Sequence, residues 1–277
     1  MDNLFQKLVN INTDILWIVL LTTFFTIELI INRSTSGKER GQHFLHGIPL
    51  LAGYTLVNFG LAFIVVLCIQ WINLNHIGIF NQIKIPYFLK VIVGVFCIDF
   101  LSYWFHRLYH TLPILWRLHR VHHSDTNMDS TTFFRFHPFD WFLDNTFVIT
   151  AAFIFGLDLN IIVFNFILYL PLLLLHHSNF IFPNWVDNTF GKIFVVPNFH
   201  KVHHHQQQEF TDSNYGNIFI LWDKLFGTYK YLPVKEIKYG LEEFDEPNRQ
   251  KFWFLLKSPF INIKPISRDV KKPFVNN

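Results

Sequence analysis

The chain has 277 residues, enough for one large domain or two small ones. Hydrophobic residues make up 51% of it and charged residues only 16%, against roughly 25% charged residues in a soluble domain, so the composition favours a membrane protein. The net charge of +3 and the lack of a basic stripe argue against a nucleic-acid partner. Cys68 and Cys97 lie in apolar runs without a C-x-x-C motif, which argues against a disulfide scaffold and a cysteine-bound iron–sulfur cluster.

The first part of the chain is predicted to be helical and membrane-embedded. The apolar segment from Ile15 to Asn32 is about long enough to cross a bilayer as a helix, and a short basic loop over 33–40 follows it. Residues 41–83 contain no Asp, Glu, Lys or Arg. We expect a second helix over 46–68 and an interfacial stretch over 71–87.

The third predicted span, from Leu89 to Tyr103, runs directly into a histidine-rich region. Residues 139–175 are again mostly apolar and predict a helical hairpin that turns at 156–160. Pro171 is expected to kink the returning helix or to end its regular hydrogen bonding. After residue 205 the chain becomes polar and rich in turns, and Phe252–Leu256 in the tail is aromatic enough for a membrane interface.

Nine histidines fall into four tight groups along this chain. The groups are His106 and His110; His119, His122 and His123; His177; and His200, His203 and His204. Spacings of three and four place histidines on one helix face. Buried polar groups near hydrocarbon are costly, so repeated clusters favour a ligand site over satisfied core histidines.

The number of histidines predicts more than one metal ion. One ion takes at most about six ligands, so nine converging imidazoles would hold two ions more naturally than one. An all-imidazole site suits iron, zinc or copper, and the residues alone leave the metal open. Asp99, two turns before His106, is a candidate acceptor for the Nδ1–H of a ligand histidine, or else a polar residue that lines the helix. His137 is a candidate for a further ligand, for a group that holds a ligand in place or for a substrate contact, whereas His176 and His205 extend groups that are already complete.

The basic loop at 33–40 predicts the orientation. If that loop is cytoplasmic, the second and third spans and the hairpin return all four histidine groups to the same side. We therefore expect an all-α integral membrane protein with four to five membrane-embedded helical segments and a cytoplasmic, histidine-rich metal-binding cap. The expected division is N-terminal membrane helices over 1–85, a catalytic domain over 86–230 and a polar, interfacial tail over 231–277.

The region around the histidines resembles the fatty acid hydroxylase/sterol desaturase superfamily. The matching runs are D-F-L-S-Y-W-F-H-R-L-Y-H (99–110), L-W-R-L-H-R-V-H-H-S (115–124), R-F-H-P (135–138), H-S-N (177–179), P-N-F-H-K-V-H-H (197–204), N-Y-G (214–216) and W-D-K-L-F-G-T-Y (222–229). The last two look most like the sterol desaturase and alkylglycerol monooxygenase branches. His205 departs from many relatives, which have a small or polar residue there.

The resemblance implies a membrane-bound oxidoreductase with two iron ions that hydroxylates or desaturates a lipid with O2 and external electrons. It implies that the nine histidines are the iron ligands, and it makes Asn214 a candidate for a residue that holds a ligand histidine in place. The chain has no flavin, haem or iron–sulfur motif, so a ferredoxin, cytochrome or reductase is the expected electron donor.

Two alternatives remain open at this stage. A fatty-acid or carotenoid hydroxylase of the same superfamily would have the same residues. A membrane metal-binding or transport protein also needs histidines, but a transport path usually spreads polar groups through the bilayer. The expected gathering of the histidines at one face favours an enzyme.

Overall fold

The computed structural model describes the backbone of residues 2–31 and 37–263, and the side chains of residues 5–13, 15–31 and 44–263. Within these ranges the chain is helical and has no β-strand, only two isolated bridges. The basic loop at 33–40, on which the predicted orientation depends, lies outside the described side chains.

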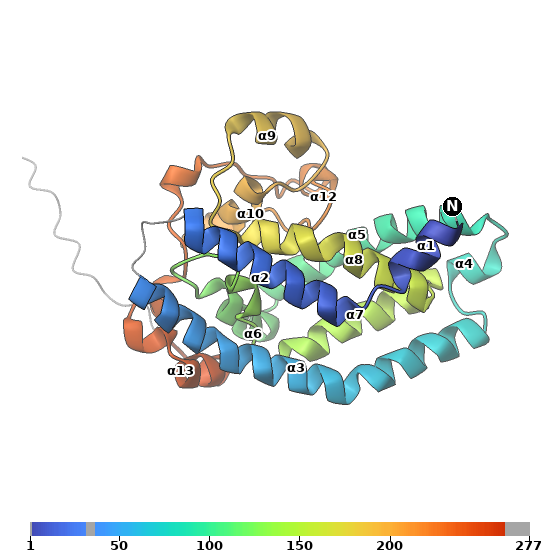
Figure 1. Ribbon diagram of the computed structural model, residues 1–277, viewed down its shortest axis with the longest axis horizontal. Helices are drawn as coiled ribbons and strands as arrows, with labels where there is room; N and C mark the ends of the chain where they lie inside the picture. The colour runs from blue at the N-terminus through green and yellow to red at the C-terminus, as the bar shows by residue number, and fades with distance from the viewer. Residues whose placement is uncertain (1, 32–36, 264–277) are drawn as a thin grey trace, which may run out of the picture.

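The longer helices run roughly along the long axis of the molecule, and short helices gather mainly at one end (Figure 1). The longer helices are α2 (Thr13–Ile31), α3 (Gly37–Leu74), α5 (Tyr87–Thr111), α6 (Pro113–His123), α7 (Asp140–Phe155) and α8 (Leu159–His177). The short ones are α1 (Asp2–Val9), α4 (Ile79–Gln82), α9 (Asn184–Thr189), α10 (Pro197–His203), α11 (Gln208–Thr211), α12 (Leu221–Leu225) and α13 (Phe252–Lys257). Single 3-10 turns lie at Thr132–Phe134, Phe190–Lys192, Val234–Glu236, Glu242–Phe244, Pro247–Gln250 and Ser258–Phe260.

Among the described residues, three segments are helical, long and apolar enough to cross a membrane: Phe44–Gln82, Tyr87–Thr111 and Leu159–His177. A shorter apolar helix covers Ile15–Ile31. Large apolar side chains on α3 point away from the protein, as in Phe59, which is 83% exposed. A soluble surface rarely presents a continuous apolar band of this kind, which supports the expected membrane character.

The second helix is longer than predicted. It continues past Cys68 through Trp71 to Leu74, and Pro49 lies inside it. No charged residue interrupts this part of the sequence, so polarity gave no signal for the helix end. The helix stops where His76 takes a φ of 53° and Gly78 a φ of 93°, which is the left-handed region that ends regular helices.

The predicted hairpin at 139–175 is present as α7 and α8. Gly156, with a φ of 71°, ends α7, and the Asp158 side chain caps α8 by accepting from the Ile161 N–H at 3.0 Å. Pro171 lies inside α8, which continues through it to His177. A Cβ at Gly78 would lie 2.1 Å from the Gly156 nitrogen, so the loop before α4 and the turn of the hairpin pack closely only because both residues are glycine.

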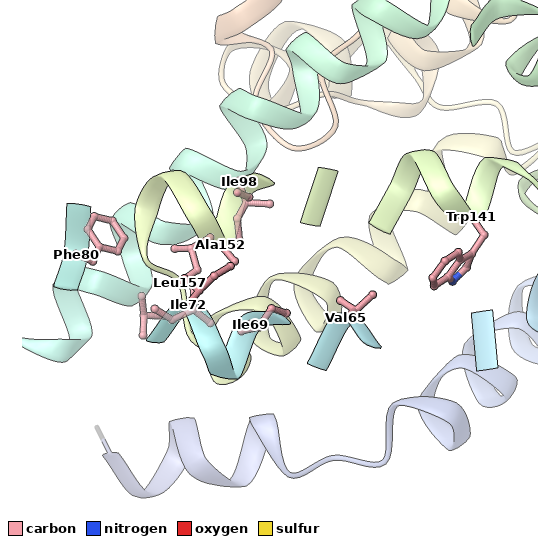
Figure 2. Close-up of a cluster of buried hydrophobic side chains, with 11 residues drawn as sticks. Val65, Ile69, Ile72, Phe80, Ile98, Trp141, Ala152 and Leu157 are labelled. Atoms are coloured by element: carbon pink, nitrogen blue, oxygen red, sulfur yellow. The ribbon is translucent and has the colours of Figure 1, made fainter. Parts of the chain in front are cut away.

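An apolar cluster holds α3, α4, α5 and α7 together at the end of the bundle away from the histidines. Val65, Ile69 and Ile72 on α3 face Ile98 on α5 and Ala152 on α7, with Phe80 and Leu157 beside them (Figure 2). Trp141 of the same cluster lies apart from them, at the start of α7. These residues are at most 8% exposed. This packing fixes the ends of α3, α5 and α7 that lie away from the histidines. It thereby helps to position the ends of these helices that lie near the histidines.

Candidate metal centre

Nine histidines converge where several helices end. His106 and His110 lie in the last two turns of α5, and His177 is the last residue of α8. The other six come from α6 and α10, which both begin with proline at their first turn, a position that suits its fixed φ. They are His119, His122, His123, His200, His203 and His204. Helices far apart in the sequence therefore supply a single cluster.

The imidazoles divide into two sets. The five-histidine set is His106, His110, His119, His123 and His203, and the four-histidine set is His122, His177, His200 and His204. Within each set, one ring nitrogen from every member lies within 4.8 Å of the others. All nine side chains are buried except His106, which is half-buried.

The short nitrogen–nitrogen distances suit metal ligation. The Nε2 atoms of His119 and His123 are 3.2 Å apart. In the other set, Nε2 of His177 lies 3.0 Å from that of His122 and 3.1 Å from that of His200. Two nitrogens bound at right angles to one ion, each about 2.1 Å from it, would be about 3 Å apart. Both sets thus have the spacing that a metal ion requires.

Several of the imidazoles are oriented by hydrogen bonds from the far side of the ring. Nδ1 of His106 bonds to the Tyr215 carbonyl at 2.9 Å, and Nδ1 of His203 to the Ser213 carbonyl at 2.7 Å. Nδ1 of His177 lies 2.8 Å from the Leu173 carbonyl within its own helix. A ring that donates from Nδ1 leaves the lone pair of Nε2 free for a metal.

Buried nitrogens without a hydrogen-bond partner support the same interpretation. Nε2 of His110, His203 and His204 is buried and has no partner among the described residues. Burying an unsatisfied polar atom costs about 1–3 kcal/mol, so three such atoms in one cluster need an explanation. Ligation of a metal by these lone pairs would remove the cost, and the donor set fits iron, zinc or copper.

The environment also keeps the histidines neutral. Burial lowers the pKa of His119, His122 and His123 well below the usual 6.5, and the same holds for His200, His203 and His204. The positive charge that a neighbouring histidine would carry adds to the effect, as His204 does for His123. A neutral imidazole is the form that binds a metal, so this pocket favours ligation at ordinary pH.

A cavity of about 380 Å³ extends from the histidines into the helical bundle between α3, α5, α7 and α8. Both histidine sets line it, His106 and His119 from the first and His122, His177 and His200 from the second. Its other walls include Phe105, Phe133, Phe136, Phe147, Phe166 and Leu173. The volume lies within the range of small-molecule sites, which are about 300–1,000 Å³.

Asp99 has a different role from the one expected. Its carboxylate accepts from the backbone N–H groups of Ile218 and Phe219, at 2.8 and 3.1 Å, and from the Trp222 indole at 2.8 Å. The expected hydrogen bond from a ligand histidine is replaced by these three donors. Asp99 therefore attaches the 218–222 segment to α5. This segment follows Tyr215, whose carbonyl orients His106.

The remaining candidate residues lie outside both histidine sets. Both ring nitrogens of His137 have backbone partners, the Leu256 carbonyl and the Phe139 N–H. Nε2 of His176 bonds to the Val195 carbonyl at 3.0 Å, and Nδ1 of His205 accepts from the Gln207 N–H at 2.9 Å. These three histidines are therefore occupied in holding the fold around the cluster.

Asn214 contacts the cluster through its neighbours. Its side chain donates to the carbonyls of Phe199 and Lys230, at 2.9 and 2.8 Å, and accepts from the Lys230 N–H at 2.9 Å. These bonds hold the loop whose Ser213 and Tyr215 carbonyls orient His203 and His106.

Sequence reasoning did not identify Asp212 or the pair formed by Tyr54 and Asp144. Asp212 Oδ1 lies 3.3 Å from Nδ1 of His110, and it immediately precedes the S-N-Y-G run, which was a usable signal. Tyr54 donates to Asp144 Oδ2 at 3.0 Å across 90 positions of sequence. No local sequence pattern predicts a contact between residues so far apart in the sequence.

Comparison with known proteins gives a consistent set of similarities. Residues 91–228 match the fatty acid hydroxylase family. The chain is 32% identical over 151 residues to alkylglycerol monooxygenase of Xenopus tropicalis, covering 52% of this chain and 31% of that protein. It is 30% identical over 155 residues to an ornithine lipid hydroxylase of Rhizobium tropici, covering 53% of this chain and 44% of that protein. It is 29% identical over 163 residues to lathosterol oxidase of Mus musculus, covering 57% and 50%.

The similarity is confined to part of each protein. The chain spans about a third of the length of the alkylglycerol monooxygenases that it matches. No solved structure matches the chain.

Proposed function

Because residues 91–228 of this chain match the fatty acid hydroxylase family, we propose that it is a membrane-bound, O2-dependent oxidoreductase that hydroxylates or desaturates a lipid. The observation that carries the proposal is the apolar cavity that ends on both histidine sets. The relatives support the same class of reaction, since they are a monooxygenase, a hydroxylase and an oxidase whose names all specify lipids.

The proposed cofactor is a pair of iron ions, one for each histidine set. His106, His110, His119, His123 and His203 would hold one ion, and His122, His177, His200 and His204 the other. When bound, such a non-haem iron pair supplies the oxidising chemistry that no side chain can perform. The orphaned Nε2 atoms and the short nitrogen–nitrogen distances support this assignment.

The residues of the chain would position the substrate and exclude water. The Ser213 and Tyr215 carbonyls hold His203 and His106 in place, which preserves the geometry that an oxidation needs. Phe136 lies parallel to the His122 ring, with ring centroids 4.6 Å apart and planes inclined by 6°, and with Phe133 it forms an aromatic wall of the cavity. An acyl, alkyl or sterol body would extend from there between α5, α7 and α8.

The proposed topology places the catalytic region, over 86–230, between N-terminal membrane helices and an interfacial tail. The candidate spans support a multi-pass arrangement, with the histidine end cytoplasmic. Electrons would come from an external ferredoxin, cytochrome or reductase on that side. Basic residues near the histidines could attract an acidic donor and raise the encounter rate. Among them, Arg120 and Lys201 are buried, which leaves Arg117 and Lys192 for this role.

The test is metal content combined with turnover. Purified protein should hold two iron ions per chain and oxidise lipid only when O2 and a ferredoxin or cytochrome reductase system are supplied. His122→Ala and His203→Ala, one from each set, should each lower the iron content towards one per chain and abolish turnover. His205→Ala is the matched control, because its imidazole bonds to Gln207, and it should keep both irons. Full activity of His122→Ala and His203→Ala would contradict the assignment of the two histidine sets as iron ligands.

A further inference from the structure

One part of the cavity is polar, although its walls are mostly aromatic and aliphatic. Tyr54 from α3, Asp144 and Asn145 from α7, and Asn165 and Tyr169 from α8 line it together. Oδ1 of Asn165 is buried and has no hydrogen-bond partner among the described residues. Polar side chains between apolar helices are costly and are usually retained for function.

The Asp144 carboxylate has spare capacity to accept a hydrogen bond. Tyr54 donates to its Oδ2 at 3.0 Å, and no described residue donates to Oδ1. The side chains of Tyr109 and Tyr169 line the same cavity. A carboxylate has about four acceptor positions, so one donor leaves most of them unused.

This acceptor lies close to the histidines. The Tyr54 ring packs on Phe136 at a centroid distance of 6.0 Å, and Phe136 stacks on His122. On the other side, the Tyr109 ring lies 5.4 Å from the ring of His119. Two aromatic rings, those of Tyr54 and Phe136, therefore connect Asp144 to His122. Asp144 also lines the same cavity as His119 and His122.

We infer that the cavity selects a neutral lipid that carries a hydroxyl group, and that Asp144, held by Tyr54, accepts the hydrogen bond from that hydroxyl near the oxidised carbon. A plain hydrocarbon segment would leave the acceptor unsatisfied when it displaced water. A fatty-acid carboxylate would meet a like charge at short range. This inference rests on the proposed function and specifies its substrate class.

The experiment measures binding without turnover. Iron-loaded protein in phospholipid nanodiscs, kept anaerobic and without a reductant, is incubated with tritiated 1-hexadecanol at mildly alkaline pH. Unlabelled 1-hexadecanol, methyl hexadecyl ether and hexadecanoic acid then compete. The alcohol should compete roughly tenfold or more better than the ether, because a hydrogen bond to a charged acceptor is worth at least a factor of that order. The acid should be weaker than the alcohol.

Variants assign the preference to Asp144. Asp144→Leu should bind alcohol and ether equally, and Asp144→Asn should bind the acid better than wild type does, because the repulsion is gone. Thr146→Val is the control on the same helix, since Thr146 is exposed and bonds to the Phe142 carbonyl, and it should leave all three affinities unchanged. The iron content shows whether each variant is folded. If Asp144→Leu does not fold, the competition results of the wild type and of Asp144→Asn test the inference.

The outcomes separate the two proposals. Equal competition by alcohol and ether in wild type, or an undiminished preference in folded Asp144→Leu, would refute the hydroxyl inference and leave the oxidase standing. A clear alcohol preference in a protein that never oxidises lipid with O2 and electrons would instead refute the proposed function.

Discussion

Asn214 shows how a single side chain can support the metal centre without touching it. Its φ of 51° lies in the left-handed region, which asparagine tolerates better than most residues. From there it makes three hydrogen bonds to Phe199 and Lys230. The carbonyls on either side of it, at Ser213 and Tyr215, face His203 and His106.

Replacing Asn214 should therefore weaken iron binding. Asn214→Ala leaves buried backbone groups unsatisfied, at roughly 1–3 kcal/mol each, and loosens the carbonyls that orient two histidines. We expect a lower unfolding temperature, measured by thermal melts. We also expect a 10–100-fold loss of iron affinity, measured by iron titration, which is the range typical when a residue that holds a metal ligand in place is replaced. Asn214→Gly tolerates the positive φ but lacks the hydrogen bonds, so wild-type iron affinity in that variant would show that only the backbone matters.

At the scale of elements, α2 is attached to the catalytic end by one buried carboxylate. Glu28, near the end of α2, is 2% exposed. It accepts from the Ser130 N–H at 3.1 Å and from the Asn179 N–H at 2.8 Å. Asn179 follows His177 by two residues, so Glu28 connects the first apolar helix to the segment that carries a histidine. Burial lowers the pKa of nearby Lys201 to about 8, and the charge of Glu28 opposes that shift.

We predict that Glu28→Leu destabilises the protein by roughly 1–3 kcal/mol for each buried donor that it leaves without an acceptor. The loss should be visible as a lower unfolding temperature in detergent micelles, together with faster proteolysis between α2 and α3. Thr26→Val on the same helix is the control, because Thr26 is exposed and bonds to the Thr22 carbonyl within α2. An unchanged unfolding temperature in Glu28→Leu would mean that apolar packing alone holds α2.

At the scale of the whole molecule, the metal centre lies at the end of the helical bundle opposite to most of the largest apolar cluster. The core cluster contains Phe80 and Leu157, near the turn of the hairpin, whereas the histidines lie at the opposite ends of α5 and α8. If the bundle spans a bilayer, all nine histidines then belong to one side. The α3 helix, with 38 residues, would extend about 57 Å at 1.5 Å per residue, more than the roughly 30 Å of the hydrocarbon core.

Labelling of single cysteines tests this arrangement. With Cys68 and Cys97 replaced by alanine, Asn127→Cys and Gln207→Cys should both react with a membrane-impermeant maleimide from the cytoplasmic side. Asn75→Cys, after the far end of α3, should react only from the other side. All three positions are exposed in the structure. Labelling of positions 127 and 207 from opposite sides would contradict a single-sided site.

The sequence by itself determined the helical class, the hairpin at 139–175 and the nine histidines that converge. These features are local, because hydrophobic runs, glycine turns and spacings of three and four depend on the period of a helix. Only the tertiary structure decided how the histidines divide into five and four, that Asp99 binds the 218–222 segment, and that Tyr54 reaches Asp144 across 90 positions. Such partners depend on how the helices pack. The residues adjacent in sequence do not indicate which distant side chain a residue contacts.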